Sequence, residues 1–161
     1  MAKGTAMHVV VGRAHPEDYP LILAVQKMAF MSEAALYGDP DLPPVVQTLD
    51  RMIEECRCKV VLKAEVGGDI VGSVRAAQDN GGVCRIGRLV VLPPWQGRGV
   101  GTALMKAIEA EFPAAEKFAI FTGHKSAGTI RLYKKLGYVE TGREPMTELV
   151  THVCMEKPGR A

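Results

Sequence analysis

Apolar residues recur at helical spacing in some parts of the chain and alternate with polar residues in others. Residues 7–13 are rich in β-branched side chains, which is typical of a strand, and residues 19–31 carry apolar positions at helical spacing on more than one side. Pro43 and Pro44 fit the first turn of a second helix that we expect to reach about Glu55. The first third of the chain is therefore predicted to be strand–helix–helix, with the first helix largely buried.

The middle of the chain predicts three antiparallel strands joined by tight turns. Polar and apolar residues alternate over residues 59–66, and Gly67, Gly68 and Asp69 connect this run to residues 70–77. The turn signal at residues 79–82 leads into a third strand over residues 83–92. Pro93 and Pro94 end that strand.

The last third predicts two helices, each followed by strand. A helix begins near Val100 and ends before Pro113, residues 118–122 form a strand, and residues 126–136 form a helix that Gly137 stops. Two strands close the chain at residues 138–143 and 149–156. The resulting order is βααβββαβαββ, which predicts an α/β (α+β) protein that contains an antiparallel three-stranded meander.

Length and composition limit the class of protein. A chain of 161 residues is enough for one domain, so we expect residues 1–161 to form a single unit. Hydrophobic residues make up 47% and charged residues 24%, which excludes wholesale disorder. The net charge of +2 is small for a nucleic-acid binder, and no stretch is apolar enough to span a membrane. With no signal-peptide pattern at the start, we expect a cytoplasmic protein.

The four cysteines do not indicate a metal site. Cys56 and Cys58 form the only close pair, and neither Cys84, Cys154 nor any histidine cluster completes a set of ligands at zinc spacing. We therefore expect no metal and mostly buried, reduced thiols.

A glycine-rich junction after the third strand of the meander is the most informative segment. The sequence from Gln96 to Gly101 reads Q-G-R-G-V-G and leads directly into a helix. Glycine lets a ligand approach the backbone closely, and the first amides of a helix have no internal partner, so the junction favours a phosphate group. The alternative is that the glycines only shape a tight turn. The dinucleotide pattern G-x-G-x-x-G fails because Thr102 replaces its last glycine, and the P-loop pattern fails because it lacks a lysine.

Two linked motifs resemble those of the GNAT superfamily of N-acetyltransferases. The segment from Val91 to Gly101 is similar to the acetyl-CoA signature V-x-P-x-x-[RQ]-G-x-G-x-[GA]. The segment from Ser126 to Tyr138 is similar to the family segment N-x-x-A-x-x-L-Y-x-x-x-G-[FY]. Nearly the whole predicted element order also matches the family, although the likeness is weakest before Lys59.

The resemblance implies a fold and a reaction. In this fold a central, mixed and mostly antiparallel sheet has one pair of splayed strands, here residues 89–91 and 118–122, and helices cover both faces. The implied activity is direct transfer of the acetyl group from acetyl-CoA to a primary amine through a tetrahedral intermediate, without metal. The alternative is a non-catalytic acyl-CoA-binding regulatory module. The acceptor is a small-molecule amine or a protein amino group, and a homodimer is compatible with the family.

The resemblance also assigns site residues. The strand residues Leu89, Val90 and Val91 would hold the acetyl carbonyl and the pantetheine arm through their main chain. Tyr133 would protonate the departing thiolate, its alternative role being that of a core aromatic. Ser126 stands where the family usually has a cofactor-binding asparagine, so its contact is in doubt. Amides of the following residues would bind the pyrophosphate: Gln96, Gly97, Arg98, Gly99, Val100, Gly101 and Thr102.

The general base is less well defined. An amine must lose a proton to attack a thioester, and the glutamate that the family often places just before Leu89 is replaced here by Arg88. We consider Glu33 the first candidate and His124 the second, although the former is compatible with a solvated helix end and the latter with a helix cap. Arg85 and Arg88 suit an acceptor that carries a carboxylate or phosphate, but only one parity of a regular strand faces the cleft.

Overall fold

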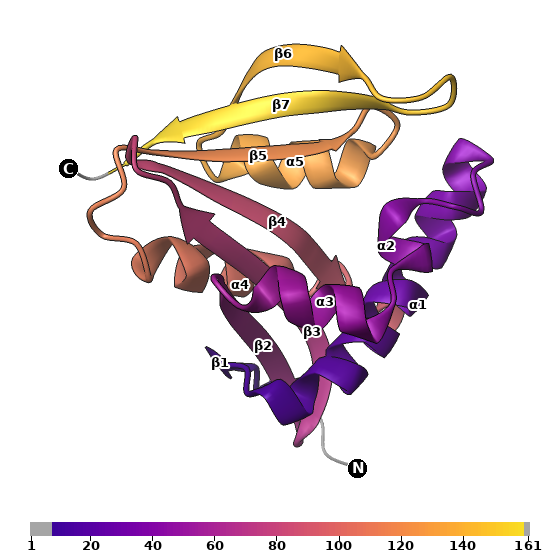
Figure 1. Cartoon of the computed structure of the whole chain (residues 1–161), viewed down its shortest axis with the longest axis vertical. Coiled ribbons are helices and arrows are strands. Elements are labelled where there is room, and N and C mark those ends of the chain that lie inside the picture. The colour runs from indigo at the N-terminus through magenta and orange to yellow at the C-terminus, as the bar shows by residue number, and fades with distance from the viewer. Residues whose placement is uncertain (1–7, 160–161) are drawn as a thin grey trace.

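A computed structural model describes residues 8–159, which form one seven-stranded sheet flanked by helices. The strand order is β1-β2-β3-β4-β5-β7-β6, and every neighbouring pair is antiparallel except β4 and β5. Figure 1 shows the sheet as a fan, with β2–β4 in one half and β5–β7 in the other. The predicted mixed, mostly antiparallel α/β fold is confirmed. The strands are β1 (Val10–Arg13), β2 (Val60–Val66), β3 (Asp69–Gln78), β4 (Val83–Val91), β5 (Lys117–Gly123), β6 (Val139–Pro145) and β7 (Thr151–Pro158).

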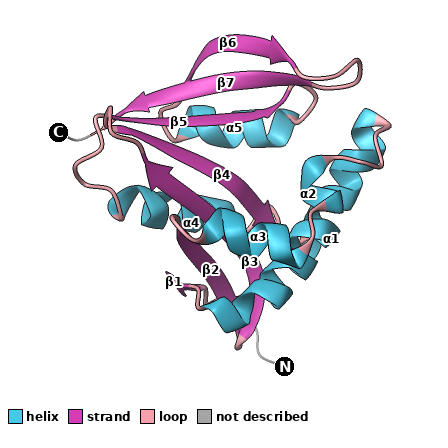
Figure 2. Cartoon of the chain, in the orientation of Figure 1, coloured by secondary structure: helices cyan, strands magenta, loops and turns pink. Residues whose placement is uncertain are grey.

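The helices cover both faces of the sheet, as Figure 2 shows. Ile22 of α1 and Met52 of α3 pack with Val61 on one face, whereas Leu104 and Ile108 of α4 belong to the large apolar cluster on the other. None of the helices among residues 8–159 is long and apolar enough to cross a lipid bilayer. The helices are α1 (Tyr19–Tyr37), α2 (Pro43–Val46), α3 (Leu49–Cys56), α4 (Val100–Ala110) and α5 (Ala127–Lys135), with short 3-10 turns at Pro16–Asp18 and Pro93–Trp95.

The second predicted helix is in fact two helices. Gln47 leaves the helical conformation with φ −58° and ψ 133°, and the Thr48 hydroxyl caps α3 by accepting a hydrogen bond from the Arg51 amide at 3.3 Å. A side-chain oxygen at this position satisfies an amide that would otherwise have no partner, so a new helix starts there. The break turns the Gln47 side chain inward, where it hydrogen-bonds both Gln26 and Glu55.

Helix α1 is longer and more exposed than predicted. It continues to Tyr37, where Gly38 ends it in the left-handed conformation at φ 63°. Leu21, Met28 and Met31 are 61%, 51% and 64% exposed, so the prediction of a largely buried helix was wrong. Helix α1 packs on the sheet through Ile22, Val25 and Ala29, and its opposite side is left uncovered among the described residues. The strand predicted from residue 7 begins at Val10; Met7 lies outside the described residues.

Strands β4 and β5 separate along their length, and this opening positions the site. They pair in parallel only from Val83↔Lys117 to Arg85↔Ala119. Beyond Arg85, β4 continues beside β3 and β5 continues beside β7, so the two halves of the sheet diverge (Figure 1). The second half of β4 therefore has a strand neighbour on one side only.

Candidate active site

Six consecutive backbone amides are free at the start of α4. Among the described residues, the amides of residues 97–102 donate no backbone hydrogen bond, whereas the Gln96 amide before them donates to Pro93 O at 3.2 Å and the Ala103 amide after them donates to Gly99 O at 3.0 Å. Amides without partners at a helix N-terminus form an anion site, reinforced by the helix dipole. The Gln96 amide, predicted as a further donor, is thus already engaged, whereas the rest of the predicted pyrophosphate segment, residues 97–102, has the free donors that this role requires.

Two glycines give this segment its shape. Gly97 and Gly99 adopt φ 72° and 87°, a region that residues with a Cβ rarely occupy. No atom would contact a Cβ at either position, so their conformation rather than crowding within the chain requires glycine. The loop is held at its base by Gln96, whose side-chain amide donates to Val91 O at 2.9 Å. The Arg98 guanidinium lies over the Trp95 ring, 5.2 Å from its centroid.

Gly101 brings helices α4 and α5 together. A Cβ there would lie 3.2 Å from Leu132 Cδ2, which is tighter than ordinary contact. The neighbouring Val100 is fully buried, and Thr102 is half-buried on the first turn. This close approach places the loop with the free amides beside α5, the helix that carries Tyr133.

The open side of β4 presents main-chain groups to the gap. The Leu92 amide donates to Val71 O of β3 at 2.8 Å, and Val91 lies opposite Gly72. Since hydrogen-bonding directions alternate along a strand, the amide and carbonyl of Val91 face away from β3, toward the opening, as do those of Leu89. The intervening Val90 is buried against Val25 and Ala29 of α1. Its side chain supports the strand from the other face.

Tyr133 lies in the apolar cluster between α4, α5 and the sheet. It is 3% exposed and packs near Tyr138, with ring centroids 5.9 Å apart, and the partly buried Leu89 and Val91 pack against the same cluster. Burial raises the pKa of the Tyr133 hydroxyl well above its ordinary value, so the hydroxyl stays protonated throughout the physiological range. No hydrogen bond to another residue among 8–159 engages that hydroxyl. The structure thus places Tyr133 in the same apolar cluster as the predicted acetyl-binding strand, with its hydroxyl protonated.

Glu33 and Ser126, 93 residues apart, are in direct contact. The Ser126 hydroxyl donates to Glu33 Oε2 at 2.8 Å. A serine has one hydroxyl proton, so the hydrogen bond of 2.8 Å between Ser126 Oγ and the Tyr37 hydroxyl has Tyr37 as donor. Tyr37 in turn accepts from the Lys125 amide at 2.9 Å. The result is a directed chain, Lys125 N–H to Tyr37 to Ser126 to Glu33, that ties the end of α1 to the loop before α5.

His124 is occupied by the backbone. Its Nδ1 lies 3.0 Å from the Thr151 amide and 3.2 Å from Thr151 O. An amide can only donate, so Nδ1 accepts from it and the proton of the neutral ring lies on Nε2. The backbone of Thr151 thus holds the His124 ring in place, which favours Glu33 as the candidate base.

A bulge in β4 sets the direction of the Arg88 side chain. Ser73 pairs with Val90 but Arg75 pairs with Gly87, so Arg88 and Leu89 lie opposite a single residue of β3. The extra residue is Arg88, with φ 51°, and it reverses the alternation of side chains beyond that point. Arg88 consequently turns toward α2 and α3, whereas Arg85 is exposed and pairs with Asp79 at 3.6 Å.

The sequence analysis missed Tyr37 and the glycine that accommodates it. Tyr37 is 5% exposed, and a Cβ at Gly123 would collide with its hydroxyl. A buried tyrosine at a helix end carries no local signal of a partner 89 residues away. Within the described part of the chain, no group of three or more histidine, cysteine or acidic residues could hold a metal ion.

The family profile described as "Acetyltransferase (GNAT) domain" matches residues 41–158, which is most of the chain. The chain belongs to the GNAT acetyltransferase family. Comparison with curated protein sequences gives no match. The predicted resemblance is confirmed. The free amides, the diverging strands β4 and β5, and Tyr133 all lie within the matched residues.

Solved GNAT structures share the fold at low sequence identity. The ribosomal-protein-S18-alanine N-acetyltransferase of Escherichia coli has a TM-score of 0.78 at 15% identity, covering 96% of this chain and 96% of that one. A GNAT-family acetyltransferase of Streptococcus pneumoniae has a TM-score of 0.76 at 18% identity, covering 94% and 99%. The PaiA N-acetyltransferase of Thermoplasma acidophilum, solved in complex with coenzyme A, has a TM-score of 0.74 at 12% identity, covering 94% and 99%.

Proposed function

We propose that this GNAT protein transfers the acetyl group of acetyl-CoA to a primary amine. The observation that carries the proposal is the run of six free amides at residues 97–102, beside the open edge of β4. The donors suit a diphosphate, and the adjacent opening suits an extended arm that ends in a thioester. Relatives of this fold include one solved with coenzyme A and one that acetylates an alanine of ribosomal protein S18.

The residues present fit acetyl-CoA. Amides from Gly97 to Thr102 would bind the pyrophosphate, while Gln96 braces the loop through Val91 O. Main-chain groups of Leu89 and Val91 would hold the pantetheine arm and the acetyl carbonyl. Ser126 already donates its proton to Glu33, so any cofactor contact from Ser126 would use its oxygen or require that bond to break.

Acetyl-CoA supplies an activated thioester, and residues of the chain accept one proton and donate another. The amine nitrogen forms a bond to the acetyl carbon through a tetrahedral intermediate as the carbon–sulfur bond breaks. Glu33 accepts the proton that the amine loses, directly or through water. Tyr133, kept protonated by burial, donates its hydroxyl proton to the departing thiolate and recovers one from solvent.

Cofactor binding and turnover test the proposal separately. Acetyl-CoA is expected to raise the melting temperature more than ATP or NAD at equal concentration, because ligand binding to the native state stabilises it by mass action. Gly99→Ala is expected to weaken this shift. Alanine at φ 87° costs about 1 kcal/mol, so the loop less readily adopts the conformation that presents its amides to the ligand. Gly142→Ala is the matched control, since a Cβ at Gly142 would meet no atom within 4 Å.

A panel of amines, followed by the release of free coenzyme A thiol, then tests for the reaction. Thiol release that depends on an amine and on acetyl-CoA is the expected result. A thermal shift with acetyl-CoA but no thiol release with any amine would instead indicate a regulatory acyl-CoA-binding module. The absence of both would overturn the proposal.

A further inference from the structure

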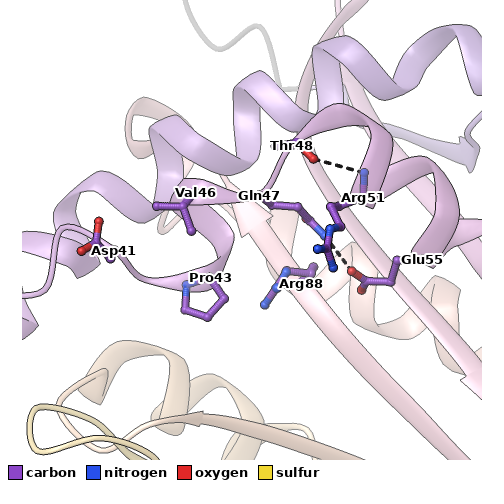
Figure 3. Close-up of a pocket in the computed structure, with 8 residues that line it drawn as sticks. All are labelled: Asp41, Pro43, Val46, Gln47, Thr48, Arg51, Glu55 and Arg88. Atoms are coloured by element: carbon purple, nitrogen blue, oxygen red, sulfur yellow. Dashed lines mark hydrogen bonds between the residues drawn. The ribbon is translucent and has the colours of Figure 1, made fainter.

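A pocket of about 400 Å³ opens between α2, α3 and the bulge of β4. It is lined mainly by Pro43, Gln47, Arg51, Glu55 and Arg88, and Figure 3 shows the Arg88 side chain extending into the space among them. Arg88 immediately precedes Leu89, whose main chain faces the opening between β4 and β5. A ligand held by Arg88 would therefore be anchored to the strand that would hold the thioester.

The acidic group deepest in this pocket is already neutralised. Glu55 accepts from Arg75 at 3.0 Å, from Gln47 at 2.7 Å and from Lys59 at 3.3 Å. Arg75, whose side chain is 3% exposed, also donates to Gln26 and Gln47 at 3.3 Å each. The Glu55 carboxylate is thus fully paired within a network formed by Arg75, Lys59 and the two glutamines.

Arg88 and Arg51 stand outside that network. Neither guanidinium forms an ion pair or a hydrogen bond with another residue among 8–159, and Arg88 Nε is buried without a partner. An unpaired buried donor on a charged group is costly, and burial together with the nearby Arg75 lowers the pKa of Arg88. An anion at this position would satisfy the donor and offset the charge.

We infer that the acceptor is an amine that carries a carboxylate, and that the carboxylate binds Arg88 with support from Arg51. The inference rests on the proposed acetyl transfer and names the substrate class of that site. A planar carboxylate matches the two-pronged donor geometry of a guanidinium. Asp41, an exposed carboxylate that also lines the pocket, disfavours a doubly charged phosphate or phosphonate. The pocket volume suits a free amino acid or the carboxylate end of a small molecule.

Matched pairs of acceptors test this inference. Each of a set of L-amino acids, with β-alanine and γ-aminobutyrate, is compared with its own amide, and kcat/KM is measured by thiol release. An amide has the more readily deprotonated amine, so a preference for the acid cannot come from amine reactivity. We expect the acid to be favoured roughly 10- to 100-fold, as for a charge-assisted hydrogen bond. Aminomethylphosphonate is compared with glycine in the same assay.

Two arginines on one strand supply the variant and its control. Arg88→Gln is expected to reduce the preference for the acid to about twofold, whereas Arg85→Gln leaves it unchanged, because Arg85 is exposed and lies outside the pocket. Both variants are first checked for an unchanged melting temperature and an unchanged shift with acetyl-CoA. Binding is also measured by calorimetry in the presence of coenzyme A, with N-acetylated amino acids and their amides as ligands, so that a second readout needs no turnover.

The outcomes separate the two proposals. If amides react as well as acids, or if the preference survives in Arg88→Gln, the carboxylate inference is wrong while acetyl transfer stands. If Arg85→Gln lost the preference for the acid as fully as Arg88→Gln, the preference would come from positive charge in general rather than from a specific contact, and the inference would be overturned. A preference for the phosphonate would do the same. A failure of acetyl-CoA to bind would show instead that the proposed function itself is wrong, whatever the calorimetry shows for acids and amides.

Discussion

The Ser126 hydroxyl donates a hydrogen bond of 2.8 Å to the Glu33 carboxylate, so helix α1 and the loop before α5 meet at the candidate base. This contact orients one carboxylate oxygen and leaves the other without a hydrogen bond among the described residues. The free oxygen is the one that could receive a proton from an acceptor amine.

Replacing Glu33 with glutamine should lower kcat at neutral pH by at least tenfold, because the amide keeps the shape but cannot accept the proton. The difference from the unaltered protein should shrink as the pH rises above the pKa of the acceptor amine, since the amine then arrives deprotonated. Ser126→Ala keeps the carboxylate and removes only its hydrogen bond, so its rates show how much the orientation of Glu33 contributes. Steady-state rates across a pH series measure both, and unaltered rates in Glu33→Gln would remove Glu33 from the mechanism.

Tyr133→Phe should lower kcat by about 10²-fold or more while the affinity for acetyl-CoA stays nearly constant, because only the proton of the leaving group is lost. Burial raises the pKa of Tyr133, so the hydroxyl remains protonated above the usual range for tyrosine and its titration should not limit kcat at moderately alkaline pH. Rates and calorimetric binding on the same preparations separate the two effects. An equal loss of affinity and rate would indicate a packing role instead.

Gly123→Ala should destabilise the protein by about 1–3 kcal/mol, because the new Cβ would collide with the Tyr37 hydroxyl and the surrounding backbone must shift. Gly142→Ala, in a strand where the Cβ meets no atom within 4 Å, should change the free energy of unfolding far less. Chemical denaturation of the two variants measures the contrast. Equal stability would mean that Tyr37 can move aside without cost.

Glu55 should make the protein sensitive to acid. Burial alone would raise the pKa of this carboxyl, but Arg75, Gln47 and Lys59 outweigh burial and lower it from 4.5 to about 2. The unfolded chain therefore takes up the proton first as the pH falls, so this contribution to stability is complete above about pH 5 and is lost toward pH 2. Unfolding free energies at several pH values should show the decline, and Glu55→Gln should remove this part of it. A variant that retains the same decline would assign the acid sensitivity to other carboxylates.

Apart from the division of the second helix at Gln47, local patterns were sufficient to predict the element order and the glycine-rich loop. Turn glycines, prolines and alternation lie within a few residues of the structure they specify, and Gly97 and Gly99 act through their own backbone angles. The contacts that complete the site are not local. Ser126 and Glu33 are 93 residues apart, and the bulge that turns Arg88 into its pocket depends on the register of β4 against β3. Neither relationship leaves a periodic trace in the sequence.

The divided sheet has a consequence for how the protein behaves without its ligand. Past Arg85, β4 is an unpaired edge in the middle of the sheet, and such edges recruit strands from other chains. We expect preparations stripped of coenzyme A to scatter more light on storage than loaded ones, because a bound pantetheine arm would cap this edge. The supply of acetyl-CoA would then affect how long the protein resists aggregation as well as its activity.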